Sequence, residues 1–187
     1  MLINLSIFSG CFKNKKIYYK SSLELRPVSN IVRKILFNWI NSFTREAIIL
    51  DLFTGSGILS FESISRKSKK ALMIDNSDVV YKYINKNALT LNIKSKVCCI
   101  YDDVYNWLVI NNFLDFDLIF LDPPYRNYNL LLKCFFLINN LFFLNSNIII
   151  YIESENYNLY KKVPYNWVLI HKKSFGKINC FLFRKLL

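Results

Sequence analysis

The sequence predicts an α/β fold in which a doubly wound, mostly parallel sheet carries helices on both faces. From residue 47 onward, short runs of apolar residues alternate with amphipathic stretches. The apolar runs are continuous, which is typical of parallel strands that are buried on both faces. Only four glycines and four prolines occur, and no Pro-, Gly- or Ser-rich linker divides the chain. We therefore expect the 187 residues to form one domain.

The expected elements follow from the spacing of the apolar residues. Strands are expected at 47–51, 71–75, 97–101, 117–121 and 147–153. Helices are expected between them at about 57–67, 78–91, 103–111 and 129–143. A further helix should begin after Pro27, because Ser29 and Asn30 can cap it and the apolar residues that follow have helical spacing.

The two ends of the chain each predict a β-hairpin. Residues 2–20 alternate loosely around Gly10 and carry several lysines, which indicates a basic hairpin. Residues 167–172 and 178–183 flank Gly176 and should close the sheet as an antiparallel pair. We expect residues 1–25 to be a hairpin extension and residues 26–187 to be a catalytic core.

The chain is strongly basic, with 25 Lys and Arg, 13 Asp and Glu, and a formal net charge of +12. Such an excess suits a polyanionic partner such as nucleic acid. An AT-rich genome would also encode a chain rich in Lys, Asn, Ile, Phe and Tyr at weakly constrained positions. The charge therefore supports a nucleic-acid partner without deciding it.

The cysteines and the apolar stretches exclude several classes of protein. Five cysteines without a Cys-x-x-Cys pair do not predict a zinc site or a disulfide framework. We expect reduced, mostly buried thiols in a cytoplasmic protein. The most apolar stretch, residues 130–152, is interrupted by lysine and asparagine, so it does not predict a membrane span.

The end of the first core strand carries the first binding signal. Ligands of open α/β sheets bind beyond the carboxyl ends of the strands, and here Asp51 is followed by Phe53, Gly55, Ser56 and Gly57. The two glycines allow a tight turn and a close backbone approach to a ligand, although a lone Gly-x-Gly is often an ordinary turn. The third glycine of dinucleotide sites is missing, and Asp51 would repel a pyrophosphate but attract an α-amino group.

Two further strand ends extend this site. Asp75, followed by Asn76, can accept hydrogen bonds from two ribose hydroxyls. Asp103, followed by Val104, can accept from an adenine amine or can simply cap the next helix, and Asp102 competes for the adenine contact. Together the strand ends describe a site for an adenosine that carries an amino acid but no phosphates. S-adenosylmethionine fits this description, whereas NAD and ATP fit poorly.

The sharpest motif is Asp122-Pro123-Pro124-Tyr125, which follows an apolar strand. Consecutive prolines stiffen the chain and remove two backbone donors, so that the carbonyls of Asp122 and Pro123 can face a substrate. These acceptors would hold the hydrogens of an exocyclic base amine and favour a more tetrahedral, nucleophilic nitrogen. Tyr125 would stack on the base.

This motif resembles the (Asp/Asn)-Pro-Pro-(Tyr/Phe) motif of a group of S-adenosylmethionine-dependent methyltransferases. Within that group the chain is similar over nearly its whole length to the bacterial 16S ribosomal RNA guanine-N2 methyltransferases. The segments that carry the resemblance are Leu25-Arg26-Pro27, Val32-Arg33, Leu36-Phe37-Asn38-Trp39, residues 51–57, Glu62 with Ser65-Arg66, residues 122–125, and residues 151–155. Residues 25–27 and 37–39 distinguish this family from DNA amine methyltransferases.

The resemblance implies a Rossmann-like class I methyltransferase fold, with a seven-stranded, mostly parallel sheet, an antiparallel last strand and a small N-terminal β-hairpin. It implies that S-adenosylmethionine lies among Asp51, Gly55 to Gly57, Asp75 and Asp103, and that residues 122–125 hold the guanine amine. The implied partner is 16S rRNA within the small ribosomal subunit, with the target guanine unstacked. We expect a monomer, without a metal and without a membrane.

The chain departs from the family pattern at a few positions. Asp75 stands where Glu is usual and is one methylene shorter, with the ribose contact still expected, and Asn14 replaces a second hairpin glycine. Val28, Ile31 and Lys34 replace a threonine, a basic and an acidic residue. These changes concern RNA docking more than chemistry.

Other polar residues have less specific interpretations. Lys13, Lys15, Lys16 and Arg26 could contact RNA phosphates, or they could be ordinary solvated side chains. The only histidine, His171, is expected to be structural, because the proposed mechanism needs none.

Glu153 and Glu155 are expected to support their neighbours rather than act as bases. The alternative functions are a DNA or other RNA methyltransferase of the adenine-N6 type, and a catalytically silent RNA-binding assembly factor.

Overall fold

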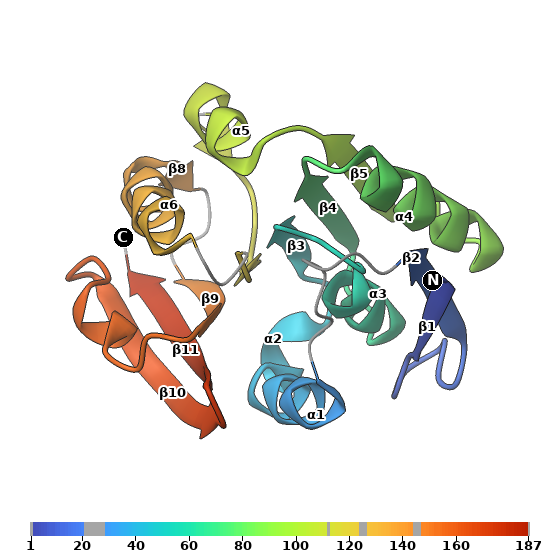
Figure 1. The fold of residues 1–187 in the computed structure, drawn as a ribbon, viewed down its shortest axis with the longest axis horizontal. Coiled ribbons are helices and arrows are strands. Elements are labelled where there is room, and N and C mark those ends of the chain that lie inside the picture. The colour runs from blue at the N-terminus through green and yellow to red at the C-terminus, as the bar shows by residue number, and fades with distance from the viewer. Residues whose placement is uncertain (1, 21–28, 112, 124–126, 144–146, 187) are drawn as a thin grey trace.

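The computed structural model describes residues 2–20, 29–111, 113–123, 127–143 and 147–186. Its centre is a seven-stranded sheet in the order β10-β11-β9-β7-β3-β4-β5 (Figure 1). The strands are β3 (Ile48–Leu52), β4 (Lys70–Asp75), β5 (Val97–Tyr101), β7 (Leu118–Leu121), β9 (Asn147–Ser154), β10 (Trp167–Phe175) and β11 (Ile178–Leu186).

The first five of these strands run parallel to one another. β3 pairs in parallel with β4 and β7, β4 with β5, and β7 with β9. The last strand, β11, lies antiparallel between β9 and β10. This topology confirms the predicted fold class, including the antiparallel end of the sheet.

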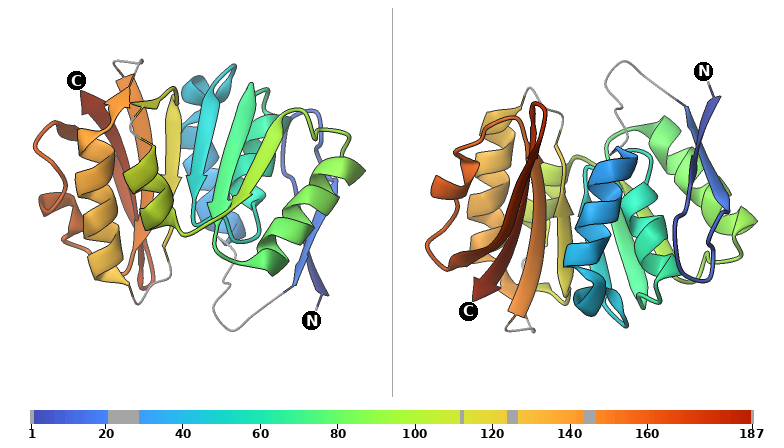
Figure 2. Two further views of the ribbon diagram at one scale, coloured as in Figure 1. Left: turned by 90° about the horizontal axis from the view of Figure 1, so that it is seen from above. Right: turned by 90° about the horizontal axis from the view of Figure 1, so that it is seen from below.

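Helices cover both faces of the sheet (Figure 2). The helices are α1 (Asn30–Trp39), α2 (Asn41–Thr44), α3 (Ile58–Ser65), α4 (Asp78–Thr90), α5 (Val104–Ile110) and α6 (Tyr128–Asn140). Buried residues of α1, α3 and α4 form one core cluster, and those of α5 and α6 form a second. Along β3, Ile49 belongs to the first cluster and Leu50 to the second, because successive side chains of a strand point to opposite faces.

Side chains cap α1, α4, α5 and α6, and the caps of α1 and α5 are at positions that the sequence suggested. The Oγ of Ser29 accepts from the Val32 N–H, as expected of a cap on α1, and Ser77 does the same for α4. Asp103 and Asn127 cap α5 and α6. The expected strands and helices are found within three residues of their predicted bounds. Short elements were not predicted, namely α2, the pair β6 (Phe113–Leu114) and β8 (Phe142–Phe143), and a 3-10 turn at Leu159–Lys161.

The N-terminal hairpin, β1 (Leu2–Ser6) and β2 (Lys16–Lys20), packs against the core through buried polar contacts. The carboxylate of Glu62, which is fully buried, accepts from the backbone N–H groups of Phe8 (2.8 Å) and Ser9 (3.0 Å). Asn87 of α4 donates to the Tyr18 carbonyl and accepts from the Tyr18 N–H. Each contact provides partners for backbone groups at the partly buried junction between the hairpin and the core.

Two residues of the hairpin turn adopt left-handed backbone conformations. Gly10 has φ 81°, and a Cβ there would lie 1.8 Å from the carbonyl oxygen of Ser65. Asn14 has φ 66°, and asparagine tolerates this region better than other non-glycine residues. The replacement of a glycine by Asn14 is therefore compatible with the turn.

Some sequence-based expectations require correction. The thiols are not mostly buried, because Cys134 and Cys180 are buried, whereas Cys99 is partly exposed and Cys11 and Cys98 are exposed. The apolar sequence around these cysteines did not reveal which of them face solvent, because that depends on the packing of the hairpin turn, β5, α6 and β11 that carry them. No helix in the described ranges is long and apolar enough to cross a membrane.

The position of His171 agrees with a structural role. It lies on the exposed side of β10 and stacks on Trp39, with 5.1 Å between ring centroids.

Candidate active site

The turn after β3 is built from left-handed backbone conformations. Phe53, Gly55 and Gly57 have φ values of 65°, 55° and 73°. The Thr54 N–H donates to the carbonyl of Ile74 in β4 (3.1 Å), and the Gly57 N–H donates to the Thr54 carbonyl (2.9 Å). A side chain at Gly57 would meet Ile84 Cδ1 at 2.3 Å. The turn therefore needs glycine here both for its conformation and for close packing.

Helix α3 begins directly after this turn, and its N-cap residue, Gly57, provides no side-chain hydrogen bond. Ser56 is buried, and Gly55 is only partly exposed. The predicted glycine turn is thus a strand-to-helix connection with its backbone close to the carboxyl edge of the sheet.

Asp51 lies at the end of β3 and is only 4% exposed. One carboxylate oxygen accepts from the Ser60 hydroxyl of α3 at 2.5 Å. The pKa of Asp51 is raised to about 7, because burial and, to a lesser extent, the nearby charge of Asp75 outweigh the lowering effect of the hydrogen bonds from Ser60. A cation beside this carboxylate would favour the ionised form.

Asp75, at the end of β4, holds the glycine turn. One oxygen accepts from the Gly55 N–H (2.8 Å), and the other accepts from the Ser77 N–H (3.0 Å). Burial raises the pKa of Asp75, while these two hydrogen bonds lower it. The following residue, Asn76, is exposed. The sequence had pointed to Asp75 as a ribose ligand, and the structure adds a second role as the support of the turn.

Asp103 acts as a helix cap, which was one of its two predicted roles. Its Oδ1 accepts from the N–H groups of Tyr105 (2.9 Å) and Asn106 (3.1 Å). The competing residue, Asp102, accepts from the Asp103 N–H (2.7 Å). Val104 is buried under the first turn of α5. The contact of Asp103 with an adenine amine stays a prediction.

Asp122 and Pro123 follow β7, next to β3 in the sheet. Pro123 is buried and Asp122 is partly buried. Burial raises the pKa of Asp122 well above its usual value, and the charges of Glu153 and Asp51 raise it further. Pro124, Tyr125 and Arg26 lie outside the described residues, so the roles predicted for them stay predictions.

Four acids line the carboxyl edge of neighbouring strands. Asp75, Asp51 and Glu153 lie at the ends of β4, β3 and β9, and Asp122 follows β7 between the last two. Among the described residues, none of them forms an ion pair. Unpaired carboxylates at a sheet edge favour a ligand with positive charge. No group of His, Cys, Asp and Glu in the described part of the chain could hold a metal ion.

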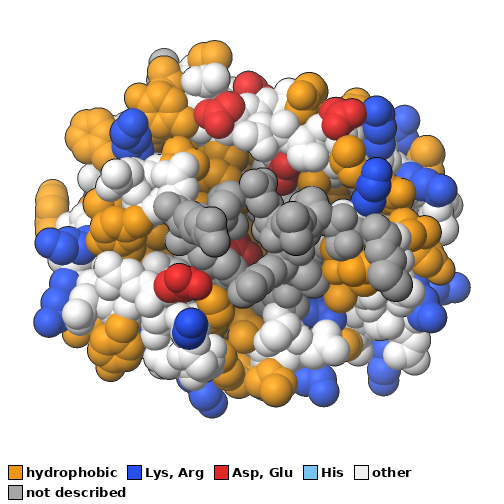
Figure 3. Space-filling view, in the orientation of Figure 1, with side chains coloured by type: hydrophobic (Ala, Val, Ile, Leu, Met, Phe, Trp, Pro, Cys, Tyr) orange, Lys and Arg blue, Asp and Glu red, His pale blue; other side chains and the backbone are white. Residues whose placement is uncertain are grey.

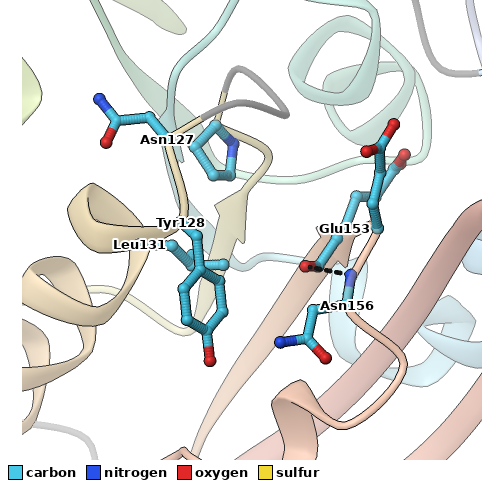
Figure 4. A pocket seen from close by; sticks show the side chains of 8 residues that line it. Asn127, Tyr128, Leu131, Glu153 and Asn156 are labelled. Atoms are coloured by element: carbon cyan, nitrogen blue, oxygen red, sulfur yellow. Dashed lines mark hydrogen bonds between the residues drawn. The ribbon is translucent and has the colours of Figure 1, made fainter.

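A pocket of about 210 Å³ adjoins this acidic row (Figure 4). Tyr128 and Leu131 come from α6, and Glu153 and Asn156 lie across from them at the end of β9 and just beyond it. The full lining is Pro123, Asn127, Tyr128, Leu131, Glu153, Ser154, Glu155 and Asn156.

The sequence analysis placed only Pro123 of these residues in a site. Glu153 could have been found, because it follows the same strand-end rule as Asp51. It also supports a neighbour, as expected, because its Oε1 accepts from the Tyr151 hydroxyl at 2.8 Å. Asn127, Tyr128 and Asn156 carry no such signal, since only the packing of α6 against β9 brings them together.

The hairpin lysines lie apart from this edge. Lys13, Lys15 and Lys16 are exposed, and the hairpin turn bonds to Ser65 at the end of α3, close to where β4 begins. The view onto the carboxyl edge shows acidic side chains toward its middle and Lys and Arg side chains around its outline (Figure 3). The prediction that the hairpin lysines contact RNA therefore requires RNA that extends along the side of the molecule.

Comparison with known proteins gives a consistent result. A family model described as conserved hypothetical protein 95 matches residues 5–184. A protein named ribosomal RNA small subunit methyltransferase D, from Buchnera aphidicola, is 35% identical over 95% of this chain and 91% of its own length. The protein of the same name from Escherichia coli K12 is 30% identical over 97% of this chain and 90% of its own.

Solved structures share the fold. The Escherichia coli protein yhhF, described as a methyltransferase, has a TM-score of 0.89 at 29% identity and covers 98% of both chains. SMU.776, described as a methyltransferase complexed with SAH, has a TM-score of 0.70 at 13% identity and covers 90% of this chain and 53% of its own. At that identity the second likeness concerns the fold alone.

Proposed function

Because the chain belongs to the conserved hypothetical protein 95 family, with curated relatives named ribosomal RNA small subunit methyltransferase D, we propose that it methylates the N2 amine of a guanine in 16S rRNA of the small ribosomal subunit. At a coarser level, the chain is an S-adenosylmethionine-dependent rRNA methyltransferase. The target base, the small subunit as substrate and a monomeric state are the proposed parts.

The residues at the carboxyl edge fit S-adenosylmethionine, which supplies an electrophilic methyl group when bound. This ligand carries a cationic amino group and a sulfonium, and the row of unpaired acids suits both charges. Asp51 would accept from the amino group, and the turn at Gly55 and Gly57 leaves room for a close backbone approach. Asp75 and Asp103 would hold the ribose and the adenine, and Asp103 Oδ2 is not used by the cap.

The observation that carries the proposal is the position of Asp122 and Pro123 between the glycine turn and the pocket of Figure 4. An exocyclic amine is a poor nucleophile because its lone pair is delocalised into the ring. The Asp122 carboxylate and the adjacent carbonyl would accept hydrogen bonds from its two hydrogens and hold the nitrogen in position. The pocket would receive the unstacked base.

The test is methyl transfer from labelled S-adenosylmethionine to small subunits of a strain that lacks the enzyme, followed by nucleoside analysis. We expect N2-methylguanosine from the wild-type protein. In Asp122→Ala, kcat should fall by about 100-fold or more, because interactions made to the reacting group contribute roughly 3 kcal/mol or more. S-adenosylmethionine affinity should change little.

Methylated adenine or cytosine as the product would contradict the proposed target. A wild-type protein that binds small subunits but not S-adenosylmethionine would instead indicate a silent assembly factor.

A further inference from the structure

The pocket beside Pro123 has a volume that suits a small ligand such as one base. Its volume of about 210 Å³ is below the roughly 300–1,000 Å³ typical of pockets for drug-sized ligands. The ring of Tyr128 forms one wall (Figure 4), and aromatic rings of this kind stack on bases. Leu131, near the start of α6, adds apolar surface to the pocket lining.

Glu153 presents a hydrogen-bond acceptor beside Asp122. Its Oε1 accepts from the Tyr151 hydroxyl, and no described residue donates to its Oε2. Glu153 lines the pocket. Leu121 of β7 pairs with Ile152 of β9, so Asp122 and Glu153, the residues that follow them, are neighbours. A base amine held at Asp122 therefore has an acceptor next to it along the wall of the pocket.

Asn156 presents a donor on the same wall. Its Oδ1 accepts from the Asn158 N–H (2.9 Å), and its own backbone N–H donates to the Ser154 hydroxyl (3.1 Å). Because the Asn158 N–H needs an acceptor, its hydrogen bond identifies which side-chain amide atom of Asn156 is the oxygen. The amide nitrogen then points across the pocket toward Tyr128 (Figure 4) and donates to no described residue.

The order of the acceptors of Asp122 and Glu153 and the donor of Asn156 matches the Watson–Crick edge of guanine. Guanine presents the N2 amine, then the N1–H donor, then the O6 acceptor. Adenine and cytosine also have an exocyclic amine, but the neighbouring ring nitrogen is an acceptor in both. That lone pair would face the Glu153 carboxylate, and a buried acceptor without a donor is strongly disfavoured.

We propose that Glu153 and Asn156 select guanine, with Glu153 Oε2 accepting from N1–H and the Asn156 amide donating to O6 while Asp122 holds the N2 amine. This inference rests on the proposed function and names the residues that determine its specificity. Reading the Watson–Crick edge is the usual way to select a flipped base.

The test compares two bases that share the reacting amine. Small subunits are reassembled with 16S rRNA that carries either guanine or 2,6-diaminopurine at the methylated position. Diaminopurine keeps the N2 amine but has an acceptor at N1 and an amine at position 6. At pH 8.5, above the pKa of about 7 to which burial raises Glu153, we expect kcat/KM of the wild type to be at least 100-fold lower on diaminopurine.

A double variant should reverse this preference. In Glu153→Gln with Asn156→Asp, the new amide can donate to N1 and the new carboxylate can accept from the 6-amine. Both substitutions keep an oxygen for the Tyr151 hydroxyl and the Asn158 N–H. We expect the guanine-to-diaminopurine ratio of kcat/KM to fall by at least 100-fold. Glu46→Gln with Asn85→Asp, both outside the pocket, makes the same exchange of a carboxylate and an amide and should leave the ratio unaltered.

Equal wild-type methylation of both bases at N2 would overturn this inference and leave the proposed function standing. No methylation of guanine N2 by the wild type would overturn both. The wild-type comparison needs no variant, so a double variant that fails to fold does not remove the test.

Discussion

Asp51 combines a proposed binding role with an unfavourable position for a charge. Its carboxylate is buried beside Asp75 and is balanced within the described residues by hydrogen bonds from Ser60. Burial of an unpaired carboxylate costs free energy, and such costs are common at functional sites because the ligand supplies the missing partner. The same reasoning applies to Asp122 and Glu153, because burial raises the pKa of both and the charge of Glu153 raises that of Asp122 further.

The stability of the ligand-free protein should therefore depend on the ionisation of Asp51. Its pKa rises from 3.8 to about 7 on folding, so the folded state binds the proton more tightly. The stabilisation is complete below the unfolded pKa and is lost as pH rises toward the folded pKa. A shift of about three pKa units corresponds to at most roughly 4 kcal/mol.

We expect Asp51→Asn to raise the free energy of unfolding at pH 8 by about 2–4 kcal/mol, with the difference vanishing near pH 4. Urea denaturation across this pH range measures the effect. The affinity for S-adenosylmethionine should fall at least about tenfold in the same variant. Asp78→Asn is the control, because Asp78 is exposed and pairs with Lys82 at the surface. A less stable Asp51→Asn variant at pH 8 would contradict the argument.

Asp75 should act on binding rather than on chemistry. An asparagine has one acceptor oxygen, so Asp75→Asn must give up either the Gly55 or the Ser77 hydrogen bond. We expect S-adenosylmethionine to bind about tenfold more weakly while kcat at saturation stays near that of the wild type, as for loss of uniform binding. Calorimetry and steady-state kinetics measure the two effects. A large fall in kcat with unchanged affinity would place Asp75 in the chemical step.

The hairpin of β1 and β2 is an element that depends on the core for its position. Two-stranded hairpins are only marginally stable alone, and this one is anchored by Glu62, Ser65 and Asn87. Arg33 is fully buried and reinforces the junction by donating to the Ser6 carbonyl. Glu62 and Ser65, which match the family pattern, thus serve to attach the hairpin to the core.

Gly10 provides a direct test of this attachment. Gly10→Ala places a Cβ 1.8 Å from the Ser65 carbonyl, so the hairpin turn must move away from α3. We expect a loss of about 2 kcal/mol or more in unfolding free energy and faster proteolysis within residues 2–20.

Gly176→Ala is a matched control, because Gly176 also has positive φ but has nothing within 4 Å of the added Cβ. It should cost only about 1 kcal/mol of backbone strain. Equal losses in the two variants would show that packing against Ser65 does not matter.

At the scale of the whole molecule, the charge distribution separates two kinds of ligand. Acidic side chains lie toward the middle of the carboxyl edge, and basic ones surround it (Figure 3). A small cationic ligand is suited to the acidic middle of this edge. A polyanion is suited to the basic surface around it. The net charge of +12 alone does not describe this arrangement.

The affinity for small subunits should consequently fall steeply with salt, because each phosphate contact releases counterions. We expect replacement of Lys13, Lys15 and Lys16 by alanine to reduce the slope of log affinity against log salt by about two, with S-adenosylmethionine affinity unchanged. Filter binding at several salt concentrations measures the slope. An unchanged slope would show that the hairpin does not contact the rRNA.

The sequence by itself determined the fold class and the strand positions, and it predicted three residues of the candidate site. Continuous apolar runs identify buried parallel strands, and the acid or glycine that ends each run lies at the common carboxyl edge. Asp51, Asp75 and Asp122 were found in this way. Local rules sufficed because each signal spans only a few consecutive residues.

Only the tertiary structure decided which residues face one another across the pocket. Tyr128, Glu153 and Asn156 become neighbours when α6 packs against the end of β9, and Asp75 reaches Gly55 only because β4 pairs with β3. Such contacts join residues that are about 20 or more positions apart. Their geometry depends on sheet order and helix packing, which no short sequence pattern encodes.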